Sequence, residues 1–136
     1  MVALAKDRNS PARDGKTFDF DVAAAAKIYA GAIVALSATG YATPGATATT
    51  LVAQGRAEEQ VDNTGGADGD LTVKIRKGVF RFANSSAGDL ITIAEIGDDC
   101  YIVDDQTVAK TDGTATRSIA GKIVDVDAQG VWVEFA

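Results

Sequence analysis

The segment Leu71-Thr-Val-Lys-Ile-Arg-Lys-Gly-Val-Phe-Arg-Phe82 carries the clearest fold signal in the chain. Apolar and polar residues alternate in it up to Arg76, and the apolar pattern resumes after Gly78. A period of two is typical of a strand with one buried face. We therefore expect one long strand, or two strands joined at a bulge, with a basic face in the first half.

Working outward from this segment, similar patterns predict further strands. The first begins at Lys16, where Phe18 and Phe20 alternate with aspartates. Others are expected at residues 27–36, with a bend at Gly31, and at residues 51–61, with an interruption at Gly55. Short strands are also expected at residues 100–103, 119–125 and 131–135, the last two joined by a hairpin turn at 127–130.

About seven or eight short strands separated by turn signals indicate an all-β domain. The expected architecture is a small β-sandwich or β-barrel over residues 17–136, with at most one helical turn, at residues 91–97. The Gly- and Asp-rich residues 62–70 are expected to form an exposed, flexible loop. We find no internal repeat of the kind that marks solenoid proteins.

The first sixteen residues show neither a helical nor a strand period, and we interpret them as an extended N-terminal arm. An extended segment of this kind can add itself to the edge of a neighbour's sheet, and it would become ordered only when bound. The arm residues expected to contact a partner are Val2, Ala3, Leu4, Lys6, Arg8, Arg13 and Lys16.

The composition argues against an enzyme. The 136 residues include no histidine, and Cys100 is the one cysteine, so the commonest general base and a serine or cysteine catalytic pair are missing. Cys100 is expected to be a small buried residue. We predict no cofactor and no metal.

The formal net charge of −6 argues against direct binding of nucleic acid. The sequence also has no apolar run long enough to cross a membrane and no secretion signal, so synthesis in a cytoplasm is expected.

Aspartates offer the one candidate ion site. Asp98, Asp99, Asp104 and Asp105 form a dense carboxylate set, for which calcium binding and a solvated turn are the alternatives. The spacing lacks the pattern of a calcium loop, which favours the solvated turn.

The only tryptophan lies in the last predicted strand. If Val131, Val133 and Phe135 face the core, Trp132 faces outward, where a large aromatic side chain is a typical interface anchor. The equal alternative is that Trp132 packs under a loop of its own subunit. We include Trp132 among the candidate contact residues.

The chain resembles a family of phage-encoded capsid cement, or head decoration, proteins over nearly its whole length. The segments that carry the resemblance are Leu-Val-Ala-Gln-Gly-Arg-Ala-Glu-Glu-Gln-Val-Asp-Asn-Thr-Gly at residues 51–65, residues 75–82, Tyr-Ile-Val-Asp-Asp-Gln-Thr-Val-Ala-Lys at residues 101–110, and residues 120–133. None of them is a catalytic motif.

The resemblance implies a small β-rich protein, often a homotrimer, that binds the major capsid protein on the outside of the virion shell and is assembled in the host cytoplasm. Lambda-type decoration proteins act similarly, and their N-terminal arms become ordered on the shell. The contact residues named above follow from the sequence pattern and are not matched to family positions. The alternative interpretation is a soluble β-barrel module that binds a glycan or small ligand.

Overall fold

The computed structural model describes residues 2–136, and its regular structure is almost entirely β, as predicted. Over these residues there are twelve strands and two single 3₁₀ turns, η1 (Ala87–Asp89) and η2 (Ile93–Glu95). The strands are β1 (Thr17–Asp21), β2 (Lys27–Ile28), β3 (Ile33–Leu36), β4 (Ala42–Pro44), β5 (Val52–Ala57), β6 (Val61–Asp62), β7 (Thr72–Arg76), β8 (Gly78–Phe82), β9 (Asp99–Ile102), β10 (Val108–Ala109), β11 (Ile119–Asp127) and β12 (Gly130–Phe135).

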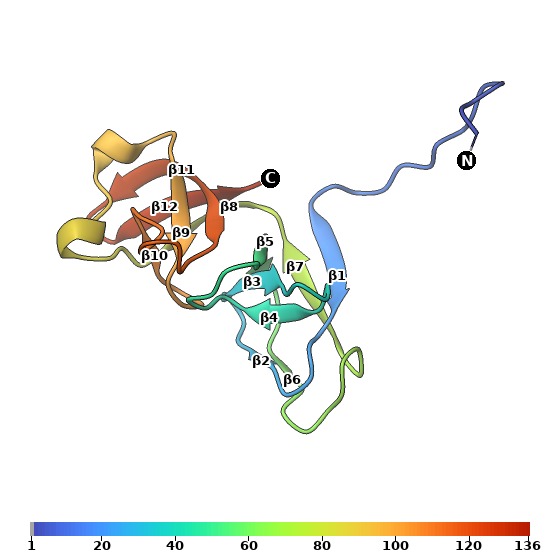
Figure 1. Ribbon diagram of the computed structural model, residues 1–136, viewed down its shortest axis with the longest axis horizontal. Coiled ribbons are helices and arrows are strands. Elements are labelled where there is room, and N and C mark those ends of the chain that lie inside the picture. Colours follow the sequence, from blue (N-terminus) through green and yellow to red (C-terminus); the bar gives the residue numbers. More distant parts are fainter. Residues whose placement is uncertain (1) are drawn as a thin grey trace.

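Two five-stranded sheets make up the body, with strand orders β1-β7-β5-β3-β4 and β10-β9-β11-β12-β8. Figure 1 shows the sheets side by side, with the chain passing from β7 in one to β8 in the other. Strands β2 and β6 form a separate two-stranded sheet. Neither large sheet closes into a barrel, because its outer edges are joined by no continuous ladder. A single isolated parallel bridge links them in each case, Val22 with Ala42 in the first sheet and Ala83 with Thr107 in the second.

The two large sheets have the same topology. If the five strands of each are numbered along the chain, both sheets read first, fifth, fourth, second, third, and all neighbours are antiparallel. The register agrees as well, since the pair Phe18–Ile75 in the first sheet corresponds to Phe80–Val133 in the second. The chain is therefore a structural duplication, in which β1–β7 and β8–β12 form two equivalent halves.

Backbone details repeat between the halves. Gly31 and Gly97 precede the second strand of each sheet with φ of 87° and 95°, a region that favours glycine. Each donates its N–H to the strand opposite, Gly31 to the Ala57 carbonyl and Gly97 to the Ile123 carbonyl, at 2.8 Å in both cases. Equal turns with equal hydrogen bonds support the duplication independently of strand order.

A second pair of glycines marks a close approach of two strands. Gly55 lies beside a register shift in the ladder between β5 and β3, and Gly121 lies beside one in the ladder between β11 and β9. A Cβ at Gly55 would lie closer than 3.0 Å to the Arg76 carbonyl oxygen, and one at Gly121 equally close to the Glu134 carbonyl oxygen. Both halves therefore require glycine at this position.

Each half has its own apolar core, and β3 contributes to both. Val34, with Ala32 just before the strand, packs in the core of the first sheet, while Ile33 and Ala35 point the other way and pack in the core of the second. Alternating side chains of a strand face opposite sides of a sheet, so β3 is buried on both faces. The outer face of the first half thus covers the core of the second.

Several predicted boundaries were wrong. The strand count exceeds the expected seven or eight because four very short strands, β2, β4, β6 and β10, were not counted separately. Residues 27–36 form two strands separated by a turn at Gly31, where one bent strand was expected. The single helical turn expected at 91–97 is present as η2, but η1 was missed.

The loop at residues 62–70 is also more organised than predicted. Asn63 is buried, with 3% of its surface exposed, and its amide donates to the carbonyls of Ala23 and Ala67 at 3.0 Å. Asp68 accepts a hydrogen bond from the Ala24 backbone at 2.7 Å. These contacts fasten the loop to the residues that follow β1.

Candidate protein-interaction surface

The N-terminal residues 2–16 form no strand or helix and are exposed throughout. Figure 1 shows them extending away from the body beyond β1. Val2 and Leu4 are 95% and 74% exposed, so two large apolar side chains lie in water. The segment meets the body at its end, where the Lys77 backbone donates to the Lys16 carbonyl at 2.7 Å and the Arg13 guanidinium lies 5.4 Å from the centre of the Phe18 ring.

Trp132 faces outward, as the alternation of β12 predicts. Val131 and Val133 are fully buried and Phe135 is 4% exposed, whereas Trp132 is half-buried on the other face. The Trp132 indole donates to the Asp127 carboxylate at 2.9 Å, and the Arg81 guanidinium lies 5.5 Å from the ring centre. Neighbouring side chains of its own half therefore hold the indole in one orientation.

These contacts stabilise the charged form of the Asp127 carboxylate. Its pKa is lowered, first by the hydrogen bond from Trp132 and also by the Gln129 backbone N–H and the charge of Arg81. Arg81 in turn donates to the Gln129 side chain at 2.8 Å. Asp127 and Gln129, at the turn between β11 and β12, thus hold Trp132 of β12 and Arg81 of β8.

A hollow of about 610 Å³ lies beside Trp132. Its lining brings together cations and aromatic rings from both halves: Gly31, Arg56, Arg76, Lys77, Gly78, Val79, Phe80, Arg81, Phe82 and Trp132. Arg56 lies 4.2 Å from the centre of the Phe80 ring and pairs with Glu58 at 2.7 Å. Sequence reasoning found Trp132 but missed these cations, because Arg56 reaches the site only through the packing of one sheet on the other.

A larger hollow, of about 690 Å³, lies between β5 and β11. Its lining includes Tyr101, Val52 and Ile119, with Arg117 at one side. Val52 and Ile119 are 59% and 49% exposed, so the hollow presents two apolar side chains to water.

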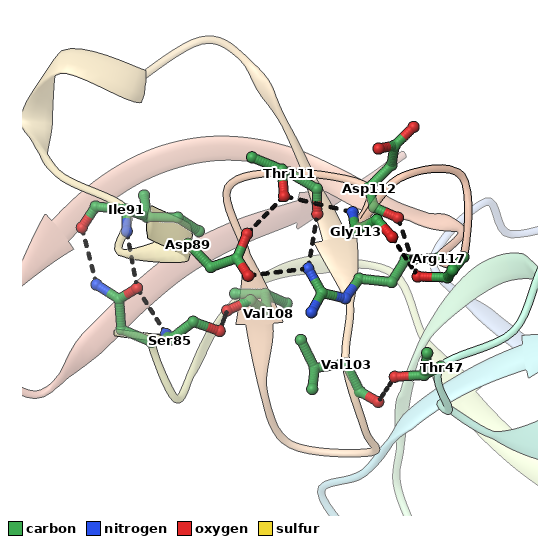
Figure 2. Close-up of polar contacts among 12 residues, drawn as sticks. Thr47, Ser85, Asp89, Ile91, Val103, Val108, Thr111, Asp112, Gly113 and Arg117 are labelled. Atoms are coloured by element: carbon green, nitrogen blue, oxygen red, sulfur yellow. Dashed lines mark hydrogen bonds and ion pairs between the residues drawn. The ribbon is translucent and has the colours of Figure 1, made fainter. Parts of the chain in front are cut away.

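Arg117 belongs to a polar network that fixes the loop before β11. Figure 2 shows the Asp89 carboxylate between Thr111 and Arg117, which donate to it at 2.5 and 3.2 Å. The Thr111 hydrogen bond is the main cause of a lowered pKa at Asp89, and Arg117 adds to it. Gly113 begins a run of three residues with φ near +60°, which this network holds in place. The cluster is a structural clamp between η1 and the loop.

The other side chains considered for chemistry are structural. Cys100 is fully buried, and burial raises the pKa of its thiol to about 12, so the nucleophilic thiolate is suppressed. Ser85 and Ser118 donate their hydroxyls to the carbonyls of Val108 and Ala48 at 2.8 and 2.7 Å.

The aspartates at residues 98–105 do not converge. Asp99 pairs with Lys122 at 2.8 Å, and Asp104 accepts the Gln106 backbone N–H at 2.9 Å, as in a turn. Among residues 2–136, no group of three or more Cys, Asp or Glu side chains is arranged to hold a metal ion. Nor does this part of the chain contain a helix of the length and apolarity that a membrane crossing needs.

Comparison with known protein families, curated protein sequences and solved structures gives no match for this chain.

Proposed function

We propose that this protein binds and stabilises the assembled shell of a phage, as a capsid cement or decoration protein on the virion surface. Its partner is the major capsid protein, it acts as a homotrimer, and its contacts are residues 2–16 and the outward face that carries Trp132. The observation that carries the proposal is the exposure of the N-terminal arm, residues 2–16, here named the leader. Its Val2 and Leu4 side chains are 95% and 74% exposed and gain burial when they pack against another surface.

The energetics fit a protein that acts in many copies. Burying a Val or Leu side chain contributes about 1.5–3 kcal/mol, so the apolar residues of one leader give only modest affinity. A protein that binds one state of a shell lowers the free energy of that state by mass action. A trimer multiplies the effect, because three leaders engage one symmetric surface together.

The charge distribution supports the same division of roles. The leader carries four Lys and Arg against two Asp, while residues 17–136 carry nine Lys and Arg against seventeen Asp and Glu, a net charge of −8. A net charge far from zero on the body favours solubility of the unbound protein. The basic leader is suited to bind an acidic surface of a partner protein.

The test is binding to purified phage heads, measured by co-sedimentation. We expect the chain lacking residues 2–16 to bind at least tenfold more weakly than the full chain, a loss of about 1.4 kcal/mol or more. Leu4→Ser is the sharper variant, and Ile93→Ser is its matched control, because Ile93 is 73% exposed, like Leu4 at 74%, but lies in η2. Equal binding by Leu4→Ser, Ile93→Ser and the unmodified chain would reject the role of the leader.

A second candidate, a module that binds a glycan or small ligand, is favoured by one observation. The hollow between β5 and β11, at about 690 Å³, falls in the size range of ligand sites, and Tyr101 offers it an aromatic surface. Light scattering separates the two candidates: a trimer, or a monomer that trimerises on heads, supports the cement role. A monomer that ignores heads and binds oligosaccharides supports the module.

A further inference from the structure

The duplication allows each surface residue of one half to be compared with its counterpart in the other. The cross-strand pair Arg81–Trp132 in β8 and β12 corresponds to the pair Asp19–Lys74 in β1 and β7. Both pairs lie in the same register, each next to a phenylalanine–valine pair whose valine is fully buried. The first half folds with two ordinary charged residues at this position, so the fold does not require an arginine and a tryptophan there.

The surroundings of this pair are also unlike the rest of the body. Four of the nine Lys and Arg in residues 17–136, namely Arg56, Arg76, Lys77 and Arg81, line one hollow, and no carboxylate lines it. Arg56 pairs with Glu58, but over residues 2–136 Arg76, Lys77 and Arg81 form no salt bridge. Positive charge is thus gathered in one place on a body whose net charge is −8.

Lys77 lines the hollow, but the partners of its ammonium group lie outside the hollow. Burial lowers the pKa of its ammonium group, which donates instead to the Gln54 and Ala136 carbonyls at 3.1 and 3.2 Å. Arg76 and Arg81 are therefore the cations of the hollow that an incoming opposite charge would meet. The aromatic surfaces of Phe80 and Trp132 add an apolar floor to the same hollow.

We propose that this hollow binds an extended acidic segment of a partner protein. Its carboxylates pair with Arg76 and Arg81, whose planar guanidinium groups match carboxylates in two-point geometry. The backbone of the segment packs on Trp132. The inference deepens the proposed function, on which it rests for the identity of the partner, by giving the chemistry of the segment that the Trp132 face receives.

Other anions fit the hollow less well. A nucleic acid would bring a continuous line of phosphates against a body of net charge −8, and the repulsion would extend beyond the hollow. A short peptide places its carboxylates only where the cations are. A second copy of this chain is a further alternative, which an experiment at low protein concentration separates from peptide binding.

The experiment uses the full chain and a fluorescein-labelled ten-residue peptide of alternating Glu and Gly, with fluorescence anisotropy as the readout. Arg81→Ala or Arg76→Ala should weaken binding about fivefold each, and the double variant about twentyfold or more. Lys74→Ala is the matched control, because Lys74 is a cation at the position equivalent to Trp132, and it should change binding less than twofold. Trp132 is the only tryptophan, so its emission should also shift when unlabelled peptide is added.

A further variant tests the argument from duplication directly. The double exchange Arg81→Asp with Trp132→Lys installs the residues that the first half carries, so the protein should remain folded by circular dichroism and lose peptide binding. The same peptide with Gln in place of Glu should not bind. Equal losses from Lys74→Ala and Arg81→Ala, tighter binding of a ten-residue oligothymidine than of the acidic peptide, or no binding at 1 mM peptide would each overturn the proposal.

Binding to heads is measured separately, so that the two proposals can fail independently. A chain that binds heads but ignores the acidic peptide refutes the peptide site and leaves the cement role standing. A chain that binds the peptide, with the variant effects above, but ignores heads supports the acidic-segment site and counts against the cement role.

Discussion

Replacing Gly55 or Gly121 with alanine should destabilise the protein to a similar degree. In either case the new Cβ would lie closer than 3.0 Å to a carbonyl oxygen of the adjacent strand, that of Arg76 or of Glu134. The strands must separate locally, which we expect to cost about two ladder hydrogen bonds, each worth about 1 kcal/mol. The expected loss of about 2 kcal/mol falls within the range for overpacking.

The corresponding change in melting temperature follows from the entropy of unfolding. At about 2.1 cal/mol/K per residue, 136 residues give roughly 0.29 kcal/mol/K, so a loss of 2 kcal/mol lowers Tm by about 7 °C. Differential scanning calorimetry measures this directly. Gly65→Ala is the control, because a Cβ at Gly65 has no atom within 4 Å, and its Tm should stay within about 1 °C.

Two results would refute this reasoning. If Gly55→Ala and Gly121→Ala both melt like Gly65→Ala, the close approach of the strands does not exist in solution. If only one of the two is destabilised, the halves are not equivalent at this position.

Three further results are expected. Hydrogen bonds from Thr92 lower the pKa of Glu95 to about 2, so the contribution of Glu95 to stability is complete above about pH 4.5 and is lost as pH falls toward 2. Glu95→Gln should therefore flatten the dependence of Tm on pH across that window. An unchanged dependence would contradict the assignment. Burial raises the pKa of Cys100 to about 12, so Ellman's reagent at pH 8 should label the thiol only in denaturant, and labelling of the native protein would show that it is accessible. Asp127→Ala removes the partner of the Trp132 indole, so the tryptophan emission should move and become easier to quench with iodide, with Tm changed by only a few degrees; unaltered emission would show that the hydrogen bond is absent.

The strands that sequence predicted best are those with one buried face. The alternation around Phe18 and in the last strand gave β1 and β12 to within about a residue, and it placed Trp132 outward. Alternating burial is a local property of the chain, so it can be recognised without knowing what covers the buried face.

The features that were missed depend on distant parts of the chain. Strands β4 and β10 have three and two residues, too few for a period to be recognised. Of the two options for the segment 71–82, two strands was right, but they are separated at Lys77 and are not joined at a bulge. Nothing local shows that β7 and β8 belong to different sheets. Asn63 was counted as an ordinary loop residue, because its stabilising hydrogen bonds are made to backbone carbonyls around residue 23, which is distant in the sequence.

The duplication was hidden for a related reason. Equivalent positions keep burial while the residue type changes, as with Val34 and Cys100, which occupy the same place in β3 and β9. A few residues are retained, namely glycines required by the backbone, such as Gly55 and Gly121, and the phenylalanines Phe18 and Phe80, but they are too sparse to form a recognisable repeat. The cations of the candidate site were unpredictable as a group, because the hollow is formed by strands from both sheets.

The position of β3 between the two cores determines how the molecule unfolds. Its alternate side chains pack in opposite cores, so without the second half Ile33 and Ala35 would face water, and without the first half the second core would lose both residues. Cleavage near Lys77 should therefore yield no durable fragment, and the chain should melt in a single cooperative step.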